Sequence, residues 1–186
     1  IIFIDDGSTD NSKKKLAGLK KKNKSLKYIT LSKNIGKARA LEGGISYAEG
    51  KYLIVMDGDF QYRAKDALKI YKIAKKGYKV VSGLRVNRKD KLLVKIFSYL
   101  YNTTLYLLTM IYMKDAFSGL KCMELKMVRS LSLNGGLYRF IIFYAKRNGF
   151  KTTEVPISHY PRFTGETKYN FIGRIKLAIS DILTIF

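Results

Sequence analysis

The stretch YLIVMDGDFQ, residues 52–61, sets the expected fold class of this chain. A largely apolar run of the length of a buried strand leads directly into Asp57-Gly58-Asp59. The first six residues, IIFIDD, repeat the arrangement, because an apolar run there ends in Asp5 and Asp6. Ligand sites of α/β proteins lie beyond the carboxyl ends of their strands, where both acidic pairs would be. The pattern therefore predicts an α/β protein with a polar site at one sheet edge.

Strands and helices alternate outward from these two runs. The elements we predict are strands over 1–4, 26–31, 52–56 and 79–83, and helices opening at 10–12 and spanning 36–49 and 66–76. This order predicts a Rossmann-like α/β fold with a mostly parallel sheet flanked by helices, in one domain over 1–186. Because the chain opens within an apolar run, we expect an earlier strand of the domain to be missing.

Two amphipathic segments, 92–113 and 171–186, follow the alternating region. Polar residues interrupt the first segment, which favours a helix in the core or on a membrane interface over a membrane span. Lysines at 20–22 and 24 would add attraction to an anionic membrane surface, and the alternative is a solvated helix face.

Charge and residue counts narrow the possible chemistry. The chain has 186 residues and carries 36 Lys and Arg against 14 Asp and Glu, a net charge of +22 that attracts polyanions. The single Cys122 and single His159 exclude a disulfide framework and zinc sites built from Cys and His. A metal in this protein would need oxygen ligands.

The acidic clusters are the first candidates for chemistry. Asp57 and Asp59, with Gln61 as a third oxygen donor, suit a hard divalent cation that also contacts a phosphate. The structural alternative for Asp57-Gly58-Asp59 is a turn that merely ends a strand. A phosphatase of the aspartyl-nucleophile type also has two aspartates after a strand, but Phe60 and Gln61 disfavour it. The loop from Asp5 to Asp10 suits a ribose and base, or simply caps a helix.

Five segments taken in order make a more specific pattern. They are IIFIDDGSTD (1–10), NIGKARALEGGISYAEGKYLIVMDGDFQ (34–61), SGLRVNRKD (82–90), DAFSGLK (115–121) and HYPRFTGETKYN (159–170). Together they resemble the family 2 glycosyltransferases of the GT-A fold, within them the polyprenyl-phosphate group that includes dolichol-phosphate mannosyltransferase. The resemblance covers nearly the whole chain.

The resemblance implies a role for each of several residues. Asp57, Asp59 and Gln61 would hold Mg²⁺ or Mn²⁺ on the donor diphosphate. The donor-binding residues would be Asp5, Asp6, Ser8, Lys37 and Asp57. The residues that bind the acceptor phosphate would be Arg85, Arg88, Ser98, Arg162 and Lys168, the last two in a closing loop. Asp57, Asp59 and Arg85 would be the catalytic residues.

The implied activity is transfer of a sugar from a UDP- or GDP-linked donor to a polyprenyl phosphate of the dolichol type. It would depend on a metal, invert the anomeric carbon and need no covalent enzyme intermediate. The resemblance also implies an enzyme associated with the cytoplasmic face of a membrane.

Two other readings stay open. The same fold could serve a polysaccharide or other soluble hydroxyl acceptor, which needs a carboxylate base, and Asp115 is the nearest candidate. A basic nucleic-acid-binding protein is the remote alternative. The aromatic residues lie in apolar runs such as 99–112 and not among the basic residues, so we expect no nucleic-acid partner.

Overall fold

The computed structural model describes residues 1–86, 92–131 and 140–161, together with residues 173, 180 and 182. The elements in chain order are β1 (Ile2–Asp5), α1 (Ser12–Lys22), β2 (Lys27–Thr30), α2 (Lys37–Ser46), β3 (Tyr52–Val55), α3 (Ala64–Ala74), β4 (Val80–Val86), α4 (Leu92–Thr109), β5 (Lys121–Glu124), α5 (Leu125–Ser130), α6 (Ile141–Arg147) and β6 (Thr152–Ser158).

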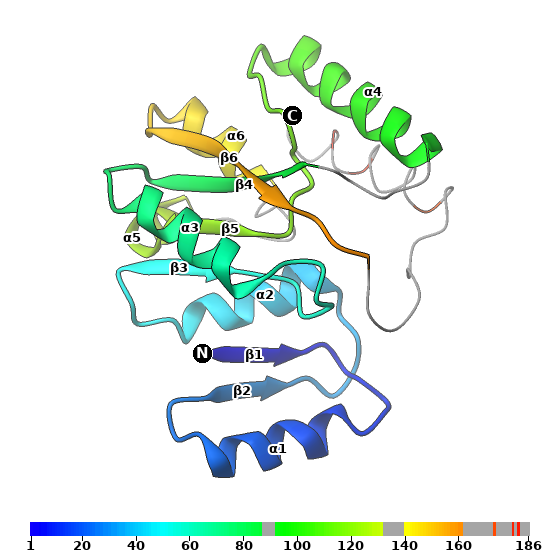
Figure 1. The fold of residues 1–186 in the computed structure, drawn as a ribbon, viewed down its shortest axis with the longest axis vertical. Helices are drawn as coiled ribbons and strands as arrows, with labels where there is room; N and C mark the ends of the chain where they lie inside the picture. Colours follow the sequence, from blue (N-terminus) through cyan, green and yellow to red (C-terminus); the bar gives the residue numbers. More distant parts are fainter. Residues whose placement is uncertain (87–91, 132–139, 162–172, 174–179, 181, 183–186) are drawn as a thin grey trace.

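The described strands form two sheets. β1 and β2 pair in parallel, and a second sheet has the order β3-β5-β4-β6 (Figure 1). β5 is antiparallel to both of its neighbours, whereas β4 and β6 are parallel, so β3, β4 and β6 all run in one direction. The α/β fold expected from the sequence is confirmed, with β5 as a reversed strand that makes the larger sheet mixed.

Apolar side chains cover both faces of the larger sheet. On one face, Ile70 and Ala74 of α3 pack with Val81, Leu120 and Cys122. The opposite face carries a larger cluster, to which β3, β4, β5, α4, α5 and α6 contribute residues including Val80, Met123, Leu105, Met127 and Ile141. Removal of these side chains from water stabilises the sheet and fixes the positions of its strand ends.

Some element ends differ from the sequence expectation. β4 continues to Val86, so Arg85 lies within the strand and not after it. α4 ends at Thr109 and not at residue 113, because Met110 adopts a left-handed conformation with φ of 55°, which stops a helix. The helix expected over 171–186 lies outside the described residues, apart from 173, 180 and 182.

The lysine-rich helix α1 and the apolar helix α4 lie at opposite ends of the molecule. Figure 1 shows α1 at one end of the longest axis and α4 at the other. All residues of α1 are described and none of them is buried. The outward side of α4 exposes Leu93 and Tyr99, at 68% and 71%. In the described part of the chain, no helix combines the length and the apolarity that a membrane crossing requires.

Candidate active site

The acidic motif lies just beyond the carboxyl end of β3. Asp57 is two residues past the last strand residue, and Phe60 then adopts a left-handed φ of 61° that turns the chain sharply. Asp59 Oδ1 accepts a hydrogen bond from the Gln61 amide at 3.2 Å. The Gln61 side chain donates to the Tyr160 carbonyl at 3.3 Å, and the Tyr160 amide donates to the Gln61 carbonyl at 3.1 Å. These bonds tie the motif to the chain that follows β6.

The loop after β1 brings Lys37 to this motif. Asp6 accepts hydrogen bonds from two backbone amides at the start of α2, those of Ile35 at 2.8 Å and Gly36 at 3.1 Å. Asp5 accepts one from the Ser8 amide at 3.1 Å and so closes its own loop. α2 begins at Lys37, whose ammonium donates to Asp57 Oδ1. These bonds connect the loop after β1 with the acidic motif through the start of α2.

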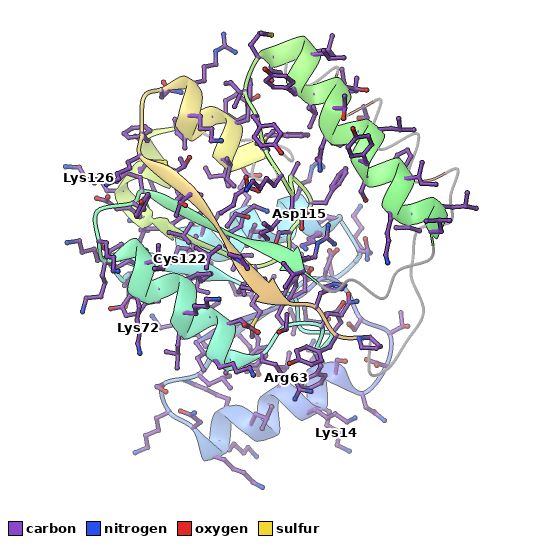
Figure 2. The ribbon with its side chains drawn as sticks, turned by 45° about the horizontal axis from the view of Figure 1, so that its top comes forward. Lys14, Arg63, Lys72, Asp115, Cys122 and Lys126 are labelled. Carbon is purple, nitrogen blue, oxygen red and sulfur yellow. The ribbon has the colours of Figure 1, made fainter. Side chains whose placement is uncertain are left out.

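Arg85 and Asp115 form a buried ion pair at β4, which β5 separates from β3. The guanidinium donates from Nε to Asp115 Oδ2 and from a terminal nitrogen to Oδ1, both at 2.7 Å, and the Arg85 amide also donates to Oδ2 at 3.2 Å. The two side chains are only 11% and 7% exposed. Figure 2 shows Asp115 between the sheet and α4, and Glu154 of β6 accepts hydrogen bonds from the amides of Lys114 and Asp115.

Tyr62 and Lys121 lie between the acidic motif and the Arg85–Asp115 pair. Burial lowers the pKa of Lys121 to about 8; Lys37 and Arg85 lower it as well, whereas Asp115 and Asp57 raise it. Burial also raises the pKa of Tyr62, and the charges of Arg85 and Asp57 act on it in opposite directions. Both side chains therefore lie within reach of the charges of Asp57 and of Arg85.

Of the remaining predicted residues, Ser98 and His159 are buried and the others lie outside the described residues. Ser98 is buried on α4, where its hydroxyl donates to the Val94 carbonyl at 2.9 Å. His159 is buried with its ring edge against Tyr62, at 5.6 Å between centroids. Arg88, Arg162 and Lys168 lie outside the described residues. Many other basic side chains project from the surface, as Figure 2 shows for Lys14, Lys72 and Lys126.

The residues of the motif fit a cation that a substrate helps to hold. No group of three His, Cys, Asp or Glu side chains in the described chain is arranged to bind a metal alone. Asp57, Asp59 and the Gln61 amide are hard oxygen donors, which suit Mg²⁺ or Mn²⁺. Mg²⁺ is commonly bound by one or two carboxylates plus substrate phosphates, and this partial set matches that mode.

The sequence analysis did not name Tyr62, and it named Gly119 and Lys121 only within the segment DAFSGLK, without a role of their own. Tyr62 directly follows the motif, Gly119 packs against Asp57, and Lys121 is buried at the start of β5. The available signal was Lys121 itself, which opens the otherwise apolar run before Glu124 and so puts a charge where the pattern predicts burial.

A sequence profile described as glycosyl transferase family 2 matches residues 1–157. The chain belongs to glycosyl transferase family 2. This confirms the family resemblance and the assignment to the glycosyltransferases. Among the relatives of this family 2 chain is an undecaprenyl-phosphate 4-deoxy-4-formamido-L-arabinose transferase of Yersinia pestis, 30% identical over 99% of this chain and 56% of its own length. An uncharacterized glycosyltransferase of Synechocystis sp. is also 30% identical, over 58% of its length. The chain therefore spans a little over half of these relatives.

Solved structures share the fold of this family 2 chain. Glucosyl-3-phosphoglycerate synthase from Mycobacterium tuberculosis, in complex with Mn²⁺, UDP-glucose and phosphoglyceric acid, has a TM-score of 0.71 at 15% identity, covering 98% of this chain and 67% of its own. A mannosyltransferase from Pyrobaculum calidifontis in complex with GDP-Man and Mn²⁺ has a TM-score of 0.62 at 17% identity, covering 89% and 48%.

Proposed function

We propose that the protein transfers a sugar from a nucleotide-linked donor to a polyprenyl phosphate, with inversion at the anomeric carbon. The observation that carries this proposal is the placement of two charged groups at β3 and β4, the strands on either side of β5 and its buried Lys121. One is the acidic motif with Lys37, suited to a cation and a diphosphate, and the other is Arg85 held by Asp115, suited to a second phosphate.

Each group has a distinct task in this proposal. Asp57, Asp59 and Gln61 would hold Mg²⁺ or Mn²⁺ against the donor diphosphate, and Asp5, Asp6, Ser8 and Lys37 would line the donor side. A cation there, when bound, offsets charge on the departing nucleoside diphosphate. Arg85, with Ser98, Arg88, Arg162 and Lys168, would orient the acceptor phosphate.

The covalent step needs no protein base. An ionised oxygen of the acceptor phosphate attacks the anomeric carbon, and the bond from that carbon to the diphosphate oxygen breaks. The nucleoside diphosphate leaves with the electron pair, and no proton has to move. Orientation and electrostatic stabilisation supply the acceleration.

The acceptor class is supported by one relative and by one feature of the site. The Yersinia pestis relative is named for undecaprenyl phosphate. A soluble hydroxyl acceptor would need a carboxylate base, and both oxygens of the candidate Asp115 accept hydrogen bonds from Arg85. We therefore favour the phosphate acceptor over the hydroxyl acceptor, within one catalytic domain over 1–186.

Contact with a membrane surface is supported by α4. Its large exposed apolar side chains are at positions 92, 93, 96, 99, 100, 106, 107 and 108, and most of them share one side of the helix. Such a face would lie in the interface of a bilayer that contains the lipid acceptor. The lysines of α1, at the opposite end of the molecule, would not lie on the same flat surface.

The test is sugar transfer by the complete protein in membranes. UDP-glucose and GDP-mannose are supplied separately with polyprenyl phosphate, with and without Mn²⁺ or Mg²⁺. We expect a prenyl-phosphate sugar that depends on the metal and disappears in Asp59→Ala. Undiminished transfer by Asp59→Ala, or product formed only on a soluble hydroxyl acceptor, would overturn the proposal.

A further inference from the structure

One peptide unit beside the acidic motif is held at both of its polar ends by buried side chains. The carbonyl of Ser118 accepts a hydrogen bond from the Lys121 ammonium, and the amide of Gly119 donates to the Tyr62 hydroxyl at 2.9 Å. This carbonyl and this amide belong to the same planar peptide bond, so two bonds fix the orientation of the whole unit. Lys121 is 2% exposed and Tyr62 is 5% exposed.

This peptide lies directly against the Asp57 carboxylate. A Cβ atom on Gly119 would overlap Asp57 Oδ2, and would lie 2.8 Å from Asp57 Cγ and 3.2 Å from the Tyr62 ring. The carboxylate therefore rests on Gly119 with no room for a methyl group between them. Its other oxygen, Oδ1, accepts the hydrogen bond from Lys37. The peptide is thus the protein surface that limits where Asp57 can point.

The two side chains reach the peptide from different parts of the fold. Tyr62 follows Gln61 in the acidic motif itself, whereas Lys121 begins β5. In the sheet, Lys121 lies opposite Val55, two residues before Asp57, and opposite Ser82 of β4. The register of β5 between β3 and β4 therefore sets the height of the Ser118–Gly119 peptide relative to Asp57.

We propose that Tyr62 and Lys121 are positioning residues that clamp the Ser118–Gly119 peptide and so orient Asp57 for the cation of the donor. The inference rests on the proposed function, in which Asp57 is a metal ligand. Side chains that orient a ligand without touching the metal commonly change metal affinity or activity by about 10–100-fold when they are removed. The clamp is suited to this task because each side chain contributes one hydrogen bond from a buried position.

The experiment uses the complete protein, with Mn²⁺ and UDP or GDP as the probes. Binding of Mn²⁺ is titrated with the nucleotide present, and the Mn²⁺ dependence of transfer is measured in parallel. Tyr62→Phe removes one hydroxyl and keeps the ring, and Lys121→Met removes the ammonium and keeps an apolar stem. We expect the half-saturating Mn²⁺ concentration to rise about 10–100-fold in each variant. Transfer at saturating Mn²⁺ should return close to the wild-type rate in Tyr62→Phe, because only the orientation of a ligand is lost.

Two controls separate the clamp from general damage and from the proposed function. Lys69→Met removes another lysine-to-carbonyl bond, to Pro156, at an exposed position, and should leave Mn²⁺ binding unchanged. Asp57→Asn should lose Mn²⁺ binding. If Tyr62→Phe is saturated by Mn²⁺ at the wild-type concentration while Asp57→Asn is defective, the clamp alone is overturned. If Lys121→Met does not fold, Tyr62→Phe decides the question by itself. Normal Mn²⁺ binding by Asp57→Asn overturns both the clamp and the proposed metal site.

Discussion

The Lys37 ammonium donates a hydrogen bond to Oδ1 of Asp57, across the boundary between the two sheets. The side chains are 47% and 31% exposed, so water and ions reach the pair. Asp57 is also the carboxylate proposed to hold a cation. In that proposal, the lysine ammonium and a divalent cation would compete for the same carboxylate.

This competition predicts that removal of the Lys37 charge strengthens the binding of Mn²⁺. Lys37→Met should tighten Mn²⁺ binding without nucleotide by about fivefold, because a unit charge about 4 Å away is worth about 1 kcal/mol in water. The same variant should weaken UDP or GDP binding, since Lys37 is proposed to face the diphosphate. Titration of Mn²⁺ alone and of each nucleotide measures both effects. Lys33→Met, at an exposed position nearby, is the control for net charge, and weaker Mn²⁺ binding by Lys37→Met would contradict the prediction.

Two glycine substitutions should have opposite effects on stability. Gly7 has a φ of 70°, and a Cβ there would lie 2.5 Å from the Asn34 backbone nitrogen, so Gly7→Ala should lower the free energy of unfolding by more than about 1 kcal/mol. Gly18 has open space around it within α1, so Gly18→Ala should raise this free energy by about 0.5–1 kcal/mol. Urea unfolding of both variants is the measurement. Equal stability of Gly7→Ala and wild type would show that the loop tolerates a side chain.

The Arg85–Asp115 pair allows its structural role to be separated from its proposed role in binding phosphate. Arg85→Met leaves a buried carboxylate without its partner and should cost about 3–5 kcal/mol of unfolding free energy. Arg85→Met combined with Asp115→Leu should recover most of that loss, because both charges are removed together. We expect transfer activity to stay absent in the double variant. Recovery of activity together with stability would make Arg85 a structural residue only.

The single thiol should be inert in the folded protein. Cys122 is fully buried, and burial raises its pKa from an ordinary value of 9.0 to about 12. We therefore expect a thiol reagent at about pH 8 to modify it only at the rate of unfolding. The raised pKa also makes the free energy of unfolding depend on pH, because above pH 9 the thiol ionises in the unfolded chain but not in the folded one. The contribution of Cys122 to this free energy is fully present below pH 9 and is lost as the pH rises toward 12. Fast labelling under native conditions, with urea-unfolded protein as the reference, would contradict this.

The first half of the fold was predictable because its signals are local. Apolar runs of four or five residues and the segments after them gave β1 to β4 and α1 to α4, with ends shifted by a few residues. β5 was not predicted, since a short strand that begins with Lys121 becomes a strand only by pairing with β3 and β4. α5, α6 and β6 were missed as well, although Asn148-Gly149 after two basic residues is a signal for the end of α6.

The same division holds for the candidate site. The acidic motif, Lys37 and Arg85 were named from sequence, and the structure pairs Lys37 with Asp57 and places Arg85 on β4, one strand beyond β5. The partners of these residues were not foreseen, because they depend on tertiary contacts. Asp6 contacts amides 29 and 30 residues away, and Asp115 is 30 residues from Arg85. Such distances along the chain leave no periodic pattern to read.

The placement of α1 and α4 at opposite ends of the molecule bears on how the two substrates would reach the site. If α4 rests on a bilayer, as proposed, the long axis stands upright on it and α1 extends into the water. The lipid acceptor and the water-soluble donor would then approach from opposite directions and meet near the middle of the molecule. The lysines of α1 would attract anionic nucleotide-sugar donors from solution and raise their concentration near the protein.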